Sequence, residues 1–147
     1  LVHVLNRLSD PANDIVPSAK GLRLHQVIVR NGSLDLNWLR IPFPLGFQGC
    51  DFYETIWAEY LQVPWLMFEG CDFTPRSQIL GGSEGAINAG NLEVAFELSF
   101  RGSRGLGQLF IPDSKIRSFS ARNEFSWLYE GEKTDETSDE ILEHISN

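Results

Sequence analysis

The sequence has little of what metal sites, disulfide frameworks and membrane spans are built from. It contains two cysteines, three histidines and one methionine among 147 residues, too few for a multi-cysteine metal site or framework. No apolar run approaches the roughly 18 residues that a membrane-spanning helix needs. Basic residues are also scarce, with 12 Lys and Arg against 20 Asp and Glu. We therefore expect no metal, no cofactor, no membrane span and no direct nucleic-acid binding.

What the sequence does contain is a six-residue motif that occurs twice. Residues 47–52 read FQGCDF and residues 68–73 read FEGCDF. Around both copies, apolar residues fall in pairs separated by one residue, and the pairs recur about every five positions, a period that fits neither a helix nor a simple strand. Each pair fits a short extended segment that ends at a corner, and four such segments return the chain over its own start. The pairs are Leu34/Leu36, Leu39/Ile41, Leu45/Phe47 and Cys50/Phe52, then Ile56/Ala58, Leu61/Val63, Leu66/Phe68 and Cys71/Phe73.

Successive turns stacked at the strand spacing would place like residues over like. Phe47 and Phe52 then lie beneath Phe68 and Phe73, which predicts two buried columns of rings. The two cysteines, at residues 50 and 71, stack in the same way. A spacing of about 4.8 Å between their Cβ atoms exceeds the roughly 3.8 Å of a disulfide, so we expect buried, reduced thiols, with a disulfide as the less favoured alternative.

Two short stretches carry a resemblance to a known family. Cys50-Asp51-Phe52 and Cys71-Asp72-Phe73, each preceded by a glycine, resemble the repeat of the pentapeptide-repeat family, clearly over residues 34–73 and more loosely over 21–127. The resemblance implies an all-β, right-handed parallel β-helix with four sides. The apolar pairs along the chain predict about four to five coils. The resemblance also implies that Asp51 and Asp72 bond local backbone at a corner. The chain departs from the strict repeat, because many small-residue positions hold Leu and three prolines interrupt the faces.

The remaining segments predict a domain from 1 to 129 and a separate C-terminal segment. Apolar residues within 1–9 predict a short helix that caps the first coil. The rhythm breaks in a glycine-rich stretch, predicted to be an irregular excursion over 74–91. From residue 130 to 143 the chain has seven acidic residues and one base, Lys133, so most of the net charge of −8 lies in the segment 130–147. That segment is predicted to form a second helical cap, with a disordered tail as the alternative.

No catalytic constellation emerges from the sequence. The glycine-rich stretch 102–107 is followed by another strand pattern, which favours turn glycines over a phosphate cradle. No nucleophile has a sequence-supported partner among the histidines. Asp51, Asp72 and Asp113 could suggest the acids of a sugar-cleaving β-helix, but glycoside hydrolysis needs two carboxylates across a groove. We therefore predict a non-enzymatic protein.

The best candidates for a binding surface are Trp57, Tyr60 and Trp65. They fall between the inward pairs, so they point outward or into corners, and such residues are enriched at interfaces. The favoured function is a protein-interaction scaffold whose partner is another protein or a neighbouring domain. The alternative is a carbohydrate-active or carbohydrate-binding β-helix that uses the 74–91 excursion.

The family resemblance also raises a minor alternative, a DNA mimic that binds a topoisomerase. The near-neutral body of the chain disfavours it, because such mimics carry acid along the whole solenoid. No secretory signal is visible, so a cytoplasmic location is expected. The chain starts at Leu1 without a Met and could be a fragment. The oligomeric state is left open.

Overall fold

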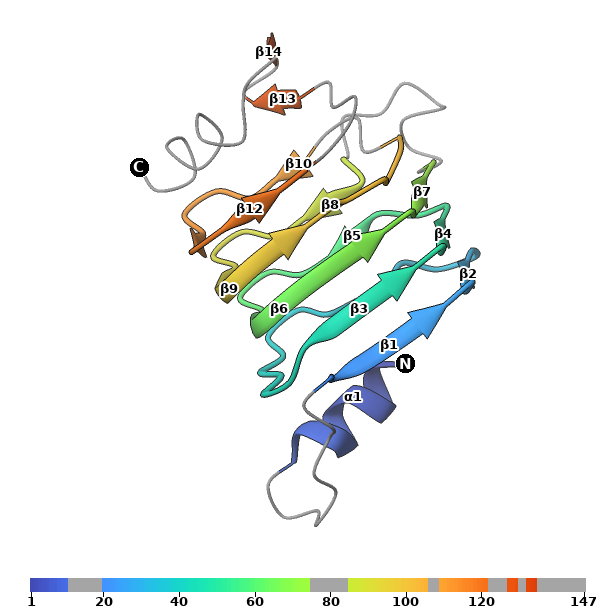
Figure 1. Cartoon of the computed structure of the whole chain (residues 1–147), viewed down its shortest axis with the longest axis vertical. Coiled ribbons are helices and arrows are strands. Elements are labelled where there is room, and N and C mark those ends of the chain that lie inside the picture. Colours follow the sequence, from blue (N-terminus) through green and yellow to red (C-terminus); the bar gives the residue numbers. More distant parts are fainter. Residues whose placement is uncertain (11–19, 75–84, 106–108, 122–126, 130–131, 135–147) are drawn as a thin grey trace.

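The chain winds into a parallel β-solenoid of about four turns. The computed structural model describes residues 1–10, 20–74, 85–105, 109–121, 127–129 and 132–134. In Figure 1 the chain crosses the near face from left to right, returns behind it and rises, so the coils are right-handed. The predicted all-β, right-handed parallel β-helix is confirmed.

One helix, α1 (Val2–Ser9), precedes the strands in the described part of the chain. The strands are β1 (Leu22–His25), β2 (Ile28–Val29), β3 (Leu45–Gln48), β4 (Asp51–Phe52), β5 (Ile56–Trp57), β6 (Gln62–Glu69), β7 (Asp72–Phe73), β8 (Ile87–Asn88), β9 (Glu93–Ser99), β10 (Leu109–Phe110), β11 (Lys115–Ile116), β12 (Phe119–Ser120), β13 (Trp127–Tyr129) and β14 (Glu132–Thr134).

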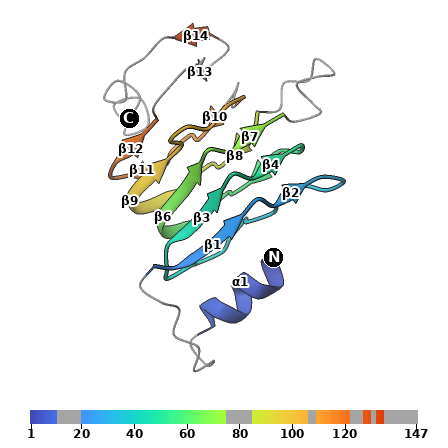
Figure 2. The same cartoon turned by 45° about the vertical axis from the view of Figure 1, so that its right-hand side comes forward.

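Each coil contributes to four walls, which we call A to D in chain order. Wall A contains β1, β3, the later part of β6, the end of β9, and β12. Wall B contains β2, β4 and β7, and wall C contains β5, β8 and β10. Wall D contains the first residues of β6 and β9, together with β11. Because the walls follow in this order around every coil, wall D lies opposite wall B (Figure 2).

The predicted register is confirmed on all four walls. Leu45 pairs with Leu66 and Phe47 with Phe68 on wall A. Asp51 pairs with Asp72 on wall B, which places the two cysteines in one column. Isolated bridges align the shorter segments of walls C and D. Like residues therefore stack in register, so each coil repeats the shape of the coil beneath it and closes the same core.

The phenylalanine columns fill the interior as predicted. Phe47, Phe68 and Phe100 stack nearly parallel, with ring centroids 5.1 and 5.3 Å apart. Phe52 stacks beneath Phe73 at 5.2 Å, and the two columns meet edge to face, as between Phe68 and Phe73 at 5.5 Å. None of these five rings is more than 2% exposed. The offset and edge contacts are the favoured geometries for aromatic rings.

The predicted excursion over 74–91 is too long. Residues 85–91 belong to the third coil, where β8 pairs with β5 and β10 on wall C. Its inward residues Ile87 and Ala89 are buried. The sequence pattern missed this segment because its inward residues include small alanines, and Gly85 and Gly90 surround them. The remainder of the excursion, 75–84, lies outside the described residues.

The two ends of the solenoid differ. Helix α1 lies beneath the first coil (Figure 2), with Leu5 fully buried, so the N-terminal cap is confirmed. At the other end, β13 pairs antiparallel with β14. The predicted domain boundary after residue 129 therefore falls inside a hairpin, because residues 132–134 still pair as a strand. The predicted C-terminal helix, within 135–147, lies outside the described residues.

Candidate functional site

The three predicted surface residues lie at different places around the second coil. Trp57 projects from wall C and is half-buried. Tyr60 lies at the corner between walls C and D, and Trp65 at the corner between walls D and A. Tyr60 and Trp65 both border wall D, whereas Trp57 does not. The structure therefore brings two of the three together around wall D and leaves Trp57 on the neighbouring face.

The corner between walls C and D is built from residues in the left-handed conformation. Trp38, Tyr60, Asn91 and Asp113 occupy it in successive coils, with φ angles of 63°, 55°, 54° and 54°. Each of the first three donates its backbone N–H to a carbonyl of the next coil, at 2.8, 2.9 and 2.9 Å. Asn and Asp tolerate this conformation, whereas a bulky aromatic residue at positive φ is an outlier. The backbone ladder holds the two rings in place.

At this corner the rings of Trp38 and Tyr60 stack on the surface. Their centroids are 4.0 Å apart and their planes differ by 10°. Trp38 is 67% exposed and Tyr60 is 44% exposed. Since Tyr60 covers one face of the indole, an exposure this high means that the opposite face of Trp38 is open to solvent.

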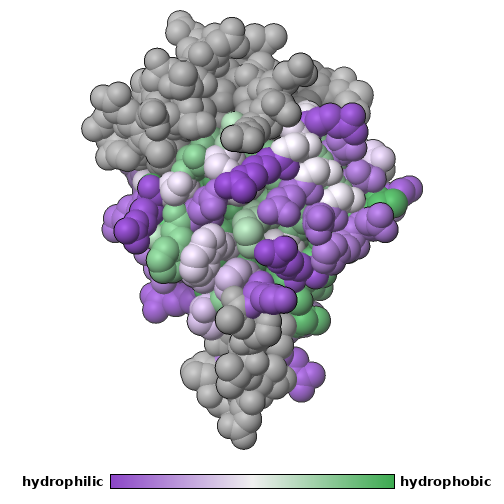
Figure 3. Space-filling model, in the orientation of Figure 1, coloured by the Kyte–Doolittle hydropathy of each residue, from purple (hydrophilic) through white to green (hydrophobic). Residues whose placement is uncertain are grey.

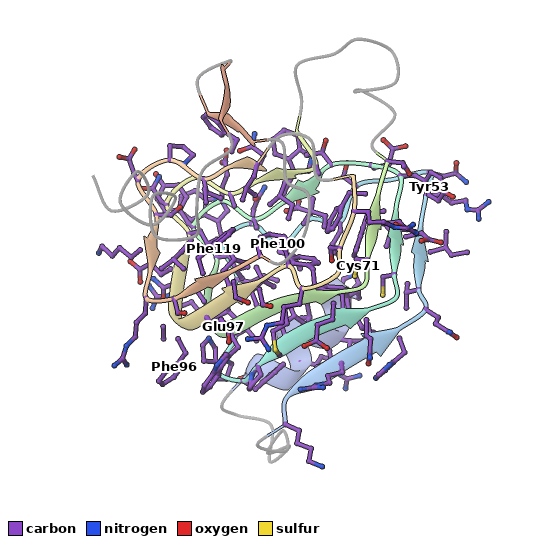
Figure 4. The ribbon with its side chains drawn as sticks, turned by 45° about the horizontal axis from the view of Figure 1, so that its top comes forward. Tyr53, Cys71, Phe96, Glu97, Phe100 and Phe119 are labelled. Atoms are coloured by element: carbon purple, nitrogen blue, oxygen red, sulfur yellow. The ribbon has the colours of Figure 1, made fainter. Side chains whose placement is uncertain are left out.

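The corner between walls D and A carries a second ring pair. Trp65 and Phe96 stack with centroids 4.0 Å apart and an angle of 13°. The register between β6 and β9 shifts between Val63 and Trp65, and a shift of this kind re-aims side chains. In Figure 4, Phe96 projects from the outer edge of the coil, beside Glu97, whereas Phe100 points inward. Phe96 is 41% exposed.

Between the two ring pairs, wall D presents a row of polar side chains. Arg40, Gln62, Glu93 and Lys115 occupy equivalent positions in coils one to four. The Lys115 ammonium lies 3.5 Å from the Glu93 carboxylate, and both side chains are exposed, at 82% and 46%. This row and the two ring pairs form one surface, which we call the wall D face. Its members are Trp38, Arg40, Tyr60, Gln62, Trp65, Glu93, Phe96 and Lys115.

Sequence reasoning missed part of this surface. Neither Trp38 nor Phe96 was among the surface residues chosen from the sequence. A signal for Phe96 was present in the spacing of the inward residues. Val63 and Leu66 are three positions apart in the second coil, whereas the equivalent Val94 and Leu98 are four positions apart in the third. The additional residue projects a further side chain at the corner.

The stacked aspartates do not take the role that the family resemblance implied. The Asp72 carboxylate accepts two hydrogen bonds from the Arg104 guanidinium, at 2.8 and 3.0 Å. No bond from Asp51 or Asp72 to local backbone is present among the described residues. An exposed arginine one coil above is the better partner, since its two donors match both carboxylate oxygens. The pairing raises the pKa of Arg104 above its ordinary value, chiefly through the hydrogen bond to Asp72.

The carboxylates that could have formed a hydrolytic site lie apart. Asp51 and Asp72 project from wall B, whereas Asp113 lies at the corner between walls C and D in the fourth coil. His3 and His25 are exposed on α1 and wall A. The third histidine, His144, lies outside the described residues. The described part of the chain contains no cluster of three or more potential metal ligands.

The two thiols are part of the core and are both free. The Cys50 Sγ donates to the Leu24 carbonyl at 3.4 Å, and the Cys71 Sγ donates to the Phe47 carbonyl at 3.4 Å. Ser103 continues the column and donates to the Phe68 carbonyl at 2.8 Å. Burial raises the pKa of the Cys71 thiol from 9.0 to about 12. A thiol that keeps its proton is a poor nucleophile.

Wall A carries a shallow hollow. It forms over Gly46, where no side chain fills the space between Arg23 and Met67, and Gln48 and Glu69 line its rim. Figure 3 shows this face as a mixture of hydrophilic and hydrophobic residues without one continuous apolar patch. Wall A therefore has less binding character than the wall D face.

Comparisons with known proteins assign no family. No protein-family model matches the chain, and neither curated proteins nor solved structures give a match. The resemblance to pentapeptide repeats therefore stays a prediction from the sequence. Within the described residues, no helix is long and apolar enough to cross a membrane.

Proposed function

We propose that this chain is a non-enzymatic interaction scaffold and that the wall D face is its protein-binding surface. The observation that carries the proposal is the pair of exposed ring stacks, Trp38 on Tyr60 and Trp65 on Phe96, at the two edges of one polar wall. Tyr, Trp and Arg dominate the energetics of protein interfaces. The wall D face contains all three types, with Arg40 exposed between the ring pairs.

The surface is also held rigidly, which favours binding. The ring pairs project from backbone that is hydrogen-bonded between coils, as at Tyr60 N–H to Gly90 O at 2.9 Å. Each ring is already packed against another in the unbound chain. A side chain ordered before binding loses less conformational entropy when a partner arrives.

The experiment compares variants of this face with variants of wall A. Immobilised wild-type chain captures partners, and capture is measured again for Tyr60→Ala, Trp65→Ala and Trp57→Ala, with Met67→Ala on wall A as the control. We expect weaker capture by Tyr60→Ala and Trp65→Ala, a smaller effect of Trp57→Ala, and no effect of Met67→Ala. All four variants should remain folded at the assay temperature, as their melting curves would show. Equal capture by the wild type and the wall D variants would contradict the proposal.

A further inference from the structure

The charge of the wall D face changes sign along the solenoid around a neutral centre. Arg40 lies in the first coil, Gln62 in the second and Glu93 in the third, and all three are in register. Arg40 is exposed and forms no ion pair with another described residue. Glu93 has an exposed contact with Lys115, and such contacts are weak and easily shared.

This order is self-complementary under one symmetry operation. Consider a two-fold axis that lies in the plane of the contact, parallel to the strands of wall D and at the level of Gln62. Rotation about it turns a second copy so that its coils run in the opposite order, while each corner of wall D faces the same corner of the other copy. Arg40 of one copy then faces Glu93 of the other, and the symmetric contact repeats it. Gln62 meets Gln62, and two amides can donate and accept in turn. Closed two-fold dimers with self-complementary surfaces are the commonest homo-oligomers.

The aromatic edges agree with the same operation. Tyr60 and Trp65 both belong to the second coil, so each meets its own counterpart across the axis. Phe96 of the third coil meets the corner of the first coil in the other copy, where Pro42 is exposed. Trp38 meets the corner position of Asn91. No like charges are opposed among these pairs.

The charge of the whole coils favours this antiparallel arrangement. Residues 20–43, in the first coil, contain four bases and one acid. The described residues of the second and third coils contain no Lys or Arg. A parallel arrangement would place Arg40 against Arg40 and Lys115 against Lys115, which is repulsive. Reversal instead brings the basic first coil of one copy beside the acidic third coil of the other.

We propose that the wall D face binds a second copy of this chain and forms an antiparallel homodimer with its two-fold axis at Gln62. The proposal rests on the proposed function, because it names the partner of the same protein-binding surface. Three overlapping coils give a contact roughly 15 Å tall at the strand spacing. Such a contact is at the small end of specific interfaces, so the dimer is weak and concentration-dependent.

Sedimentation velocity over a concentration series tests the pairing directly. Arg40→Glu and Glu93→Arg should each weaken dimerisation at least tenfold, because each creates two like-charge contacts. An equimolar mixture of the two variants should dimerise almost as well as the wild type. In that mixed dimer one contact is the native pair of Glu93 with Arg40, and the other is an opposite-charge pair with the two charges exchanged. A direct pairing of Arg40 with Glu93 across the contact predicts this rescue.

Matched controls separate the pairing from general charge effects. Arg23→Glu and Glu69→Arg make the same changes in the same coils but on wall A, and they should leave dimerisation within about twofold of the wild type. Because Glu93→Arg also places a base beside Lys115, its melting curve is recorded, and Glu93→Gln serves as a milder variant that should weaken the dimer. A wild type that stays monomeric at about 1 mM, a mixture that is not rescued, or equal loss in the wall A controls would overturn the proposal.

The outcomes also separate this inference from the proposed function. If the chain is monomeric but captures a different protein that Tyr60→Ala and Trp65→Ala release, the wall D face binds protein and the homodimer is wrong. If the charge-swapped mixture dimerises, both are supported. If neither self-association nor capture depends on the wall D face, both fall.

Discussion

Stacked aromatic rings occur on both sides of the same backbone, and the two sets differ in what surrounds them. Inside the coil, Phe47, Phe68 and Phe100 stack at 5.1 and 5.3 Å and are almost fully buried. Outside, the centroids of Trp65 and Phe96 are only 4.0 Å apart, and Phe96 is 41% exposed (Figure 4). The closer stack is the exposed one. The distance between two stacked rings therefore does not show whether they belong to the core of a solenoid. The extent to which other side chains bury the rings does.

The difference follows from what each set must do. The inner rings fill a volume fixed by the backbone, and their loss leaves a cavity that neighbouring coils cannot close. The outer rings have water on one side, so their loss leaves no cavity. The inner set should therefore determine stability and the outer set binding. Substitutions in each set test this division.

Truncation of an inner ring should have the largest effect. Phe68→Ala removes a ring that contacts four other phenylalanines and should lower the free energy of unfolding by about 3 to 5 kcal/mol. Chemical denaturation measures this change. Phe96→Ala is the matched outer control and should cost about 1.5 kcal/mol or less. A loss below about 1 kcal/mol for Phe68→Ala would contradict its place in the core.

A backbone position tests whether coil spacing is as rigid as this comparison assumes. Gly105 has φ +73°, and a Cβ there would lie 2.1 Å from the Phe73 carbonyl oxygen. Gly105→Ala should therefore destabilise the fold by about 2 kcal/mol or more, because the coils must separate locally. Gly70→Ala is the control, since its φ is +59° but nothing lies within 4 Å. If both variants melt at the same temperature, the loss of stability comes from backbone strain at positive φ, and the contact with the Phe73 carbonyl adds nothing to it.

The buried thiol column gives a further test of the inner set, because burial of Cys71 should make the stability of the fold depend on pH. Burial raises the pKa of Cys71 from the ordinary value of 9.0 to about 12 in the folded chain. The unfolded state therefore loses its proton first, so the contribution of Cys71 is fully present below pH 9.0 and is lost as the pH rises towards 12. Melting curves at alkaline pH should show a steeper decline for wild type than for Cys71→Ser.

The same thiols should also resist modification in the native state. A thiol reagent added to folded protein should label Cys50 and Cys71 slowly. After denaturant unfolds the chain, both thiols are exposed and should be labelled quickly. The rate is measured at the same neutral pH with and without denaturant. Rapid labelling without denaturant would place these side chains outside the core.

The outer rings should affect binding with the least effect on stability. Tyr60→Ala should change the free energy of unfolding by about 1 kcal/mol or less, because it removes one exposed stack. At an interface centre the same truncation should weaken binding by about 2 kcal/mol. Paired melting curves and binding isotherms check both values. Loss of stability together with binding would show that Tyr60 supports the coil beneath it.

The sequence by itself determined the repeating part of this protein. The duplicated motif at residues 47–52 and 68–73 predicted the solenoid, the register of Leu45 on Leu66 and the buried columns of Phe47 and Phe52. These features follow from side-chain periodicity, because a pair of inward residues every five positions permits only one way to close a coil. The inward cysteines were predictable for the same reason.

Only the tertiary structure decided what lies on the outside. Outward residues carry no periodic constraint, so the pattern could not show that Trp38 meets Tyr60, that Phe96 meets Trp65, or that Trp57 lies on another wall. The partner of Asp72, Arg104, is 32 residues away, and the chain between them includes the excursion whose length was misjudged. Contacts between coils depend on the total length of each turn. The sequence specifies that length only where the repeat is regular.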